Sequence, residues 1–205
     1  MLIYLHGFNS SPQSNKAQLL GRILTERGLG ACYACPALPH QPEQAVSVIE
    51  AELARAPKGS VTLVGSSLGG FYATWFAEKH GLKAVLINPA IHPHRDLRAF
   101  LGVQRNLHSG EKYELTETHL AQWAQLIVPV ITPARYMLLV ESGDELLDYR
   151  EAVEKYVGAK QVVVHGGDHT LQSFPDHIPL VLEFAGLSGA APGLSELRSR
   201  PRGRA

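Results

Sequence analysis

The chain has 205 residues, of which 45% are hydrophobic, and its 19 basic and 19 acidic side chains give a formal net charge of zero. This length and composition predict one globular domain that buries about 70% of its unfolded surface on folding. The balanced charge argues against a nucleic-acid partner or an anionic membrane surface, and no stretch approaches the roughly 18 apolar residues of a membrane-spanning helix.

The first predicted element is an apolar run from Leu2 to His6, typical of a buried parallel strand, which leads into the glycine turn of Gly7 and Phe8. The sequence starts directly in this strand, without the basic leader and small-residue cleavage site of a signal peptide, so we expect a cytoplasmic protein. An amphipathic helix over residues 14–27 follows, and Gly28 is its stop signal.

A second strand is predicted over residues 31–37, and it contains the C-x-x-C pair Cys32 and Cys35. Zinc would need a second ligand pair of similar spacing, and no helix N-terminus follows to lower a thiol pKa, so we expect two small buried residues. A helix that starts at Pro42 and ends before Pro57 comes next.

The third strand leads into the most informative stretch of the chain, Gly65-Ser66-Ser67-Leu68-Gly69-Gly70. A buried strand, a Gly-x-Ser-x-Gly turn and a helix together form the nucleophile elbow of α/β-hydrolases. The turn holds Ser67 in a strained conformation with its hydroxyl above the sheet, and the strand and helix pass so closely that Gly65 and Gly69 cannot carry a Cβ. We therefore predict that Ser67, rather than Ser66, is a nucleophile.

The remaining elements continue the alternation of strands and helices. Strands are predicted over residues 83–90, 136–140 and 161–165, and a last helix over residues 175–184. Between them, residues 92–133 contain helical pieces over 95–101 and 116–126, and no strand is evident. This stretch is either an insertion over one face of the sheet, often a lid, or an ordinary decorated crossover.

The predicted fold is therefore α/β: an α/β-hydrolase domain over residues 1–187, built as a three-layer sandwich. We expect a mostly parallel sheet of about six strands, helices on both faces and a helical insertion (about residues 92–133) after the fourth strand. Residues 188–205 are rich in Gly, Ala, Pro, Ser and Arg, and we expect a disordered tail.

Three side chains that can act together follow predicted strands. Ser67, Asp144 and His169 each lie just beyond a strand, where ligands bind in an open parallel sheet, and their chain order is that of α/β-hydrolases. An imidazole takes the proton of the serine hydroxyl, and a carboxylate orients the imidazole and stabilises its charge. Asp148 and Asp168 compete for the acid, but Asp148 lies a turn into a helix and Asp168 adjoins the histidine.

The chain has ten histidines, and the position of His169 in the sequence favours it as the base. His169 follows the last strand in a Gly-Gly turn and stands third in the order. Seven of the other histidines either end strands or fall in the insertion or last helix (His6, His165, His92, His94, His108, His119, His177). The backbone N–H groups of Leu68 and Phe8 are the predicted oxyanion donors.

These motifs resemble the YqiA-like family of small bacterial esterases over residues 2–187, in the stretches His6-Gly7-Phe8-Asn9-Ser10-Ser11-Pro12, Gly65 to Trp75, Asn88-Pro89-Ala90, Gly143 to Arg150 and Gly166-Gly167-Asp168-His169. The resemblance implies an α/β-hydrolase that acts on acyl esters and thioesters with Ser67, Asp144 and His169 as its triad. The chain departs from the family pattern in its Arg-rich tail and in Asp168, where an amide-type residue is expected.

The predicted activity is that of a carboxylesterase or thioesterase for small-molecule acyl substrates, acyl-CoA among them, with no cofactor and no metal. Phe8 and Trp123 are predicted to bind substrate, since the insertion has apolar side chains enough to line an acyl pocket. Acyl transfer, carbon–carbon hydrolysis and a non-catalytic binding module on this fold remain alternatives. A metal-dependent hydrolase using His92, His94 and His169 lacks an apparent further ligand. We expect a monomer or small homo-oligomer.

Overall fold

A computed structural model describes residues 1–57 and 61–188 of the chain. The main strands are β1 (Leu2–Leu5), β2 (Tyr33–Ala34), β3 (Thr62–Ser66), β4 (Lys83–Ile87), β7 (Tyr136–Glu141) and β8 (Lys160–Val164). The helices of the layers around them are α1 (Asn15–Glu26), α2 (Pro42–Arg55), α3 (Leu68–His80), α6 (Tyr149–Lys155) and α7 (Phe174–Phe184). The predicted Arg-rich tail beyond residue 188 lies outside the described residues.

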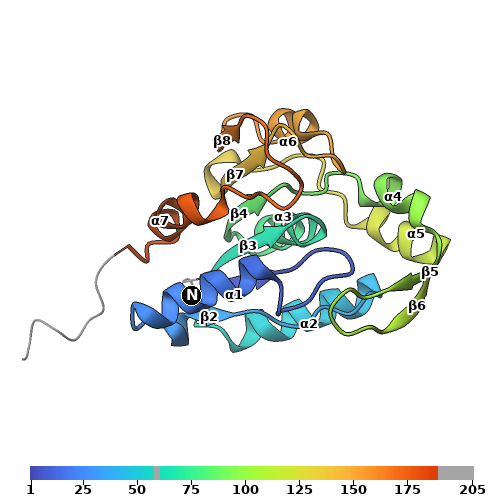
Figure 1. The fold of residues 1–205 in the computed structure, drawn as a ribbon, viewed down its shortest axis with the longest axis horizontal. Helices are drawn as coiled ribbons and strands as arrows, with labels where there is room; N and C mark the ends of the chain where they lie inside the picture. The colour runs from blue at the N-terminus through green and yellow to red at the C-terminus, as the bar shows by residue number, and fades with distance from the viewer. Residues whose placement is uncertain (58–60, 189–205) are drawn as a thin grey trace, which may run out of the picture.

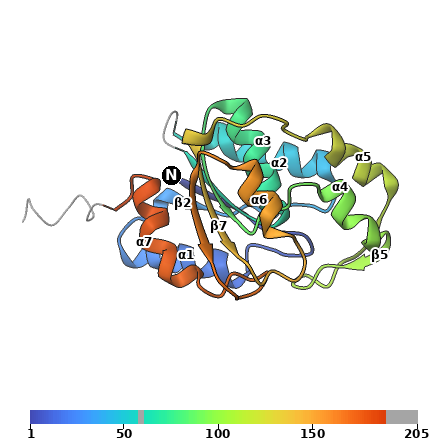
Figure 2. The same cartoon turned by 90° about the horizontal axis from the view of Figure 1, so that it is seen from above.

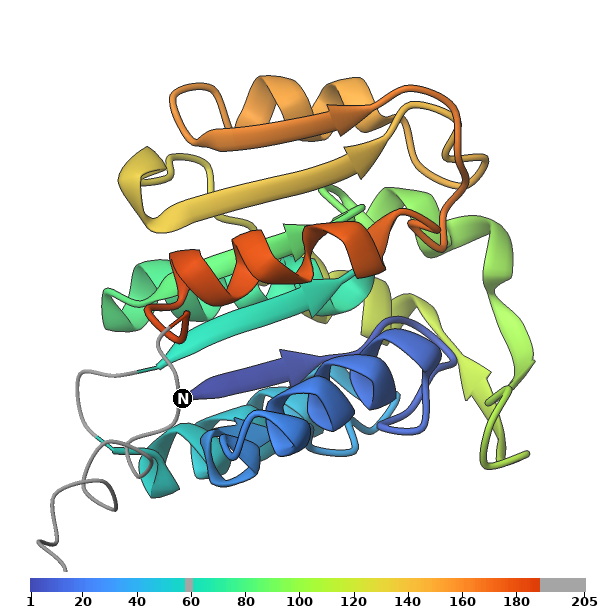
Figure 3. The same cartoon turned by 60° about the vertical axis from the view of Figure 1, so that its left-hand side comes forward.

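The strands form one parallel sheet in the order β2-β1-β3-β4-β7-β8. All the strands therefore end at the same edge of the sheet, and Figure 3 shows their arrowheads pointing toward the segment after β4. The predicted sheet of about six strands is confirmed. Because ligands bind at the carboxyl ends of parallel strands, this edge is where a site is expected.

Helices cover both faces of the sheet (Figures 1 and 2). On one face, α1 and α7 bury side chains such as Leu20 and Ile178 against Leu2 and Tyr4 of β1. On the other face, α2, α3 and α6 pack against the alternate residues of the same strands. Side chains of one strand alternate between the two faces, so a strand buried on both sides reads as a continuous apolar run. The predicted three-layer architecture is confirmed.

Residues 92–133 leave the sheet after β4, as predicted, but they are not wholly helical. They form α4 (Pro93–Asp96), a 3₁₀ turn (Leu97–Phe100), an antiparallel hairpin of β5 (Gly102–Arg105) and β6 (Lys112–Leu115), and α5 (Glu117–Gln125). The expectation that this stretch has no strand is therefore wrong. In the turn between β5 and β6, the Asn106 Oδ1 accepts from the N–H groups of His108 and Ser109 at 2.9 Å.

The second predicted strand is much shorter than residues 31–37. A 3₁₀ turn over Gly30–Cys32 precedes it, and only Tyr33 and Ala34 belong to β2, at the edge of the sheet. Cys32 and Cys35 are free thiols and only half buried, because the edge position leaves them uncovered on one side. Burial raises the pKa of Cys35 to about 12, outweighing the hydrogen bond with Tyr33 that lowers it, and this keeps the thiol protonated at neutral pH.

Within residues 1–57 and 61–188, no helix combines the length and the hydropathy needed to cross a membrane.

Candidate active site

Ser67 lies in the turn between β3 and α3, with φ 54° and ψ −122°. A non-glycine residue with positive φ is strained, and such strain persists only where the surrounding structure holds it. Here the Ser67 N–H donates to the Ile87 carbonyl at 3.0 Å, and the Ser67 carbonyl accepts from the Ala90 N–H at 3.1 Å. The segment after β4 therefore fixes the serine backbone from the side, and the nucleophile-elbow geometry predicted from the sequence is present.

The glycines around Ser67 are required by close backbone approaches. A Cβ on Gly65 would lie 2.6 Å from the carbonyl carbon of Gly69 and 2.7 Å from Cα of Gly70. A Cβ on Gly69 would collide with the Leu5 carbonyl of β1 and lie 2.8 Å from the His6 carbonyl oxygen. Gly65 thus allows α3 to approach its own strand, whereas Gly69 allows it to approach the neighbouring strand.

Asp144 and His169 are brought together by the loops after β7 and β8. His169 Nδ1 lies 2.8 Å from Asp144 Oδ2 and 3.0 Å from Oδ1. The side chain of Asp144 is only 2% exposed, and that of His169 is 17% exposed. Asp144 Oδ1 also accepts from the N–H groups of Leu146 and Leu147, at 2.9 Å each, so the carboxylate is held by its own loop. The other ring nitrogen of His169, Nε2, is therefore the one that is not bonded to Asp144.

Ser67 and His169 line one cavity of about 460 Å³ at the carboxyl edge of the sheet. No hydrogen bond joins Ser67 Oγ to the imidazole among the described residues, a state often seen in sites without substrate. The cavity volume falls within the range of about 300–1,000 Å³ that is typical of small-molecule sites. The structure therefore brings the serine and the imidazole to one cavity, with the Asp144 carboxylate hydrogen-bonded to the imidazole.

The predicted oxyanion donors lie at the same place. Phe8 and Leu68 both line the cavity. A Cβ on Gly7 would lie 3.1 Å from Cβ of Ser67, so the loop after β1 passes directly beside the serine. Within residues 1–57 and 61–188, the N–H groups of Phe8 and Leu68 have no hydrogen-bond acceptor. Both donors are thus available to a ligand.

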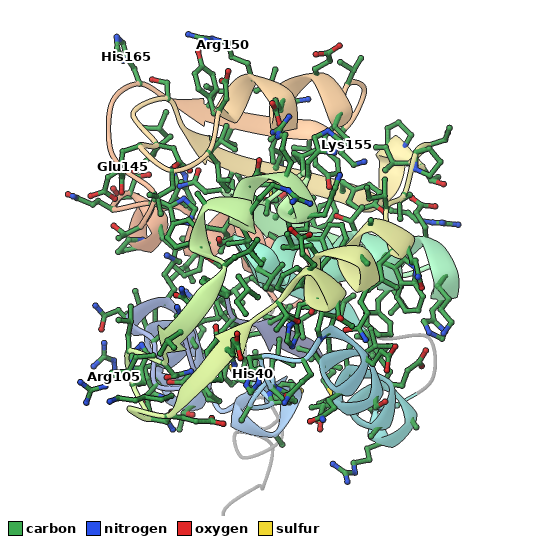
Figure 4. All side chains as sticks on the ribbon, turned by 90° about the vertical axis from the view of Figure 1, so that its right-hand side faces the viewer. His40, Arg105, Glu145, Arg150, Lys155 and His165 are labelled. Carbon is green, nitrogen blue, oxygen red and sulfur yellow. The ribbon has the colours of Figure 1, made fainter. Side chains whose placement is uncertain are left out.

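The walls of the cavity are largely apolar, and the insertion supplies part of them. Leu97, Phe100 and Leu107 come from it, and Leu146 and Leu147 come from the loop after β7. The hairpin is held over the cavity by the β1 loop: the Leu107 N–H donates to the Asn9 carbonyl at 3.0 Å. His40, beside the hairpin in Figure 4, stacks on Tyr113 of β6 with ring centroids 3.9 Å apart.

Trp123 does not line this cavity, so its predicted role in substrate binding is wrong. Its side chain is fully buried in the core between α5 and α3. Its Nε1–H donates to the Tyr72 hydroxyl at 2.7 Å, which satisfies the only polar atom of the indole. The residue therefore anchors the insertion to α3, whereas Phe8, the other predicted substrate-binding residue, lies at the cavity.

The two competing carboxylates have other partners. Asp148 caps α6 by accepting from the Arg150 N–H at 3.0 Å. Asp168 accepts from the N–H of Thr170 at 2.8 Å and from the side chains of Thr170 and Gln172. Hydrogen bonds from Thr170 and then from Gln172 lower the pKa of Asp168, so it is ionised at neutral pH without a bond to the His169 ring.

Three other histidines, His6, His92 and His94, lie in segments that follow β1 and β4. His6 Nε2 accepts from the Leu38 N–H at 3.0 Å, and burial lowers the pKa of its imidazole. His92 and His94 lie with ring centroids 5.9 Å apart. No group of three potential metal ligands occurs in the part of the chain that the structure describes.

Two buried polar residues at the site were not anticipated. Glu141, the last residue of β7, is 1% exposed and accepts four hydrogen bonds from the loop that carries His169. Asn88, directly after β4, is 2% exposed, has a positive φ of 39° and donates to the same loop. In the sequence, each of the two is a polar residue at the C-terminal end of an otherwise apolar strand.

Comparison with known proteins agrees with this architecture. The model of the uncharacterised protein family UPF0227 matches residues 1–186. A UPF0227 protein of Shewanella baltica (strain OS155) is 28% identical over 100 residues, which cover 48% of this chain and 55% of the relative. The chain thus spans about half the length of this curated relative.

Solved structures show the same fold at low sequence identity. The alpha/beta hydrolase domain-containing protein 10 from mouse has a TM-score of 0.64 and 15% identity, covering 88% of this chain and 86% of its own. The esterase domain of a Rhodothermus marinus protein has a TM-score of 0.60 and 16% identity, covering 91% of this chain and 84% of its own. The chain therefore has the α/β-hydrolase fold.

Proposed function

The chain belongs to the uncharacterised protein family UPF0227, and we propose that this member is a serine hydrolase that cleaves carboxylic esters or acyl thioesters. The observation that carries the proposal is the strained Ser67 at the same cavity as the hydrogen-bonded pair His169–Asp144. A serine on a strained turn, an imidazole and a buried carboxylate are the groups that acyl transfer needs.

In the first half of the reaction, Ser67 Oγ attacks the carbonyl carbon of the substrate while His169 Nε2 takes the hydroxyl proton. Asp144 accepts the Nδ1–H and so fixes the tautomer that leaves Nε2 free to act as a base. The C–O or C–S bond then breaks as the imidazolium returns its proton to the leaving alcohol or thiol. The product is an acyl-enzyme on Ser67.

In the second half, a water molecule attacks the acyl-enzyme with His169 again as the base. The carboxylic acid leaves, and the proton returns to Ser67 Oγ, so the enzyme is regenerated without any redox step. The N–H groups of Phe8 and Leu68 stabilise the oxyanion in both halves, and a donor of this kind contributes about 3 kcal/mol.

The cavity also supports an acyl substrate rather than a peptide. Leu97 and Phe100 of the insertion give it an apolar wall opposite the sheet edge. Burial of a methylene contributes about 0.8 kcal/mol, so kcat/KM should rise about fourfold for each methylene until the cavity is filled. Acyl thioesters such as acyl-CoA belong to the same proposal because the attacked carbonyl is equivalent.

Acyl transfer to another alcohol and carbon–carbon hydrolysis use the same groups, and a binding module would use none of them. A fluorophosphonate probe separates the last case, because only an activated serine reacts with it. Ser67 should carry the adduct in mass spectrometry, Ser67→Ala should not react, and Ser47→Ala, on the exposed face of α2, should react like the parent.

Activity is tested with a panel of esters and acyl-CoAs of graded chain length. Ser67-dependent release of free acid supports the hydrolase. An adduct on Ser66, or a fully active Ser67→Ala variant, would show that the assignment is wrong.

A further inference from the structure

The loop that carries His169 is held from below by one buried carboxylate. Glu141 Oε2 accepts from the N–H groups of Asp168 at 2.8 Å and Gln172 at 3.2 Å. Its Oε1 accepts from the Ser173 N–H at 2.9 Å and the Ser173 hydroxyl at 2.6 Å. Glu141 therefore fixes the backbone immediately before His169 and again three and four residues after it.

The approach of this carboxylate is so close that the loop needs glycine there. Gly167 has φ +72°, and a Cβ on it would collide with the Glu141 carboxylate and lie 2.8 Å from its Cγ. The loop with Asp144 is joined to the same segment, since the Gly143 N–H donates to the Gly166 carbonyl at 2.8 Å. The two loops that carry His169 and Asp144 thus meet over Glu141.

Asn88 connects this assembly to the nucleophile. Its Nδ2 donates to the carbonyls of Asp168 and His169 at 3.1 Å each, and its Oδ1 accepts from the Glu141 N–H at 3.0 Å. The residues on either side of it, Ile87 and Pro89–Ala90, include the two backbone groups that hold Ser67. One short segment after β4 is therefore bonded to the serine backbone and, through Asn88, to the histidine backbone.

We propose that Asn88 and Glu141 are positioning residues that set the place of the His169 imidazole relative to Ser67. Neither touches the cavity, so they act through the loop backbone. The inference rests on the proposed serine hydrolase, in which the imidazole must move a proton to and from Ser67. The strained φ of Asn88 fits this role, because Asn tolerates positive φ and its amide supplies a donor and an acceptor at once.

The chemistry of Glu141 explains why a carboxylate is needed at this place. All four of its hydrogen-bond partners are donors, and an ionised carboxylate is an acceptor at both oxygens. Burial alone raises the pKa of Glu141, but the hydrogen bonds from Ser173, Asp168 and Gln172 outweigh burial and lower it. In Glu141→Gln, an NH₂ group would face N–H donors, so part of the loop must move.

The chain contains a matched control at the opposite end of the same strand. Glu78 of α3 accepts from the Thr132 N–H at 2.7 Å and the Tyr136 hydroxyl at 2.7 Å, and pairs with Arg135 at 2.8 Å. It also holds a loop by several donors, and it does not line the cavity. Glu78→Gln therefore removes a carboxylate that holds a loop, but it should leave the position of His169 unchanged.

The experiment compares Glu141→Gln, Asn88→Asp and Glu78→Gln in the full chain, with kcat, KM and melting temperature for each. Asn88→Asp keeps the side-chain size and the acceptor for Glu141 but places an oxygen against the carbonyls of Asp168 and His169. Because a displacement of about 1 Å in a catalytic site can cost about 100-fold, kcat should fall about 10- to 100-fold in both site variants, with KM within about twofold. Glu78→Gln should lose thermal stability only.

A second measurement does not depend on activity. In proteins with isotope-labelled histidine rings, the His169 ring signal should shift or broaden in both site variants and stay in place in Glu78→Gln. A parent-like His169 signal in Glu141→Gln and Asn88→Asp, or a parent-like kcat in either, overturns the inference. If the parent has no Ser67-dependent activity, the proposed function fails while the ring signal still decides the positioning role.

Discussion

The close backbone approach at Gly65 gives a quantitative test of the site. In Gly65→Ala, the new Cβ would lie 2.6 Å from the carbonyl carbon of Gly69, whereas carbon atoms pack best at about 3.5–4.0 Å. Strand β3 and helix α3 must therefore separate by about 1 Å. Ser67 lies between them and Leu68 begins α3, so the hydroxyl and one proposed oxyanion donor move with the helix.

A displacement of about 1 Å can lower turnover about 100-fold, and overpacking of this kind costs about 1–3 kcal/mol of stability. For a chain of this size, that loss lowers the melting temperature by about 2–12 °C. The assays are kcat on a short-chain ester, the rate of fluorophosphonate labelling, and thermal unfolding. Gly30→Ala is the control, because its Cβ would meet only Thr25, with the hydroxyl oxygen nearest at 3.1 Å, and neither residue lines the cavity.

A Gly65→Ala protein with kcat within about threefold of the parent would refute the reasoning, whatever its melting temperature. If the melting temperature falls but the rate of fluorophosphonate labelling does not, the separation of β3 and α3 does not displace Ser67. A parent-like melting temperature together with lost labelling would instead mean that the methyl group is accommodated by a change in the Ser67 conformation alone. Strand β3 and helix α3 would then keep their separation, which contradicts the expected displacement of the helix.

Three other outcomes are expected. His169→Ala and Asp144→Asn should leave folded proteins with kcat lowered by about 1,000-fold or more, as judged by steady-state kinetics beside circular dichroism. Phe100→Ala should flatten the rise of kcat/KM with chain length, while Trp123→Phe, outside the cavity, should keep the parent slope across the same ester series. The folded-state pKa of Glu141 is lowered, so its contribution to stability is full above its unfolded pKa of about 4.3 and is lost as the pH falls through the folded value. The melting-temperature difference between the parent and Glu141→Gln should therefore be largest near neutral pH and shrink below about pH 4; a difference that grows with acidity would contradict this sign.

The sequence predicted the sheet and the elbow because both follow from local rules. Buried parallel strands are continuous apolar runs, and the spacing of Gly65 and Gly69 around Ser67 encodes a close approach of strand and helix. The meeting of Asp144 and His169 was predictable for the same reason, since each follows a strand of one parallel sheet. Here the site is a consequence of topology rather than of side-chain detail.

The first strand of the hairpin in the insertion, β5, was not predictable from its pattern. Gln104 faces inward on β5, where an apolar residue is expected, because its Oε1 accepts from Asn9 at 3.3 Å. Val103 faces outward and is 78% exposed. A short strand whose inward residue is polar and whose outward residue is apolar reverses the alternation that identifies a strand. The role of Trp123 was missed for a related reason: only tertiary packing against Tyr72 decides that the indole lies in the core.

The acidic side chains around His169 show most clearly where a sequence stops being informative. By residue type, any acidic side chain of the two loops or their ends could orient an imidazole: Glu141, Asp144, Glu145, Asp148 and Asp168. Their hydrogen bonds separate them. Glu145 accepts from the backbone N–H of His169 at 2.9 Å. Asp148 caps a helix, Asp168 is occupied by Thr170 and Gln172, and Glu141 is occupied by four donors below the loop. Only Asp144 combines backbone donors that fix it with a free approach to the His169 ring. Glu141 already accepts four bonds from the loop, whereas Asp144 accepts two from its own loop and retains acceptor capacity for the imidazole, which favours Asp144 as the acid of the proposed site.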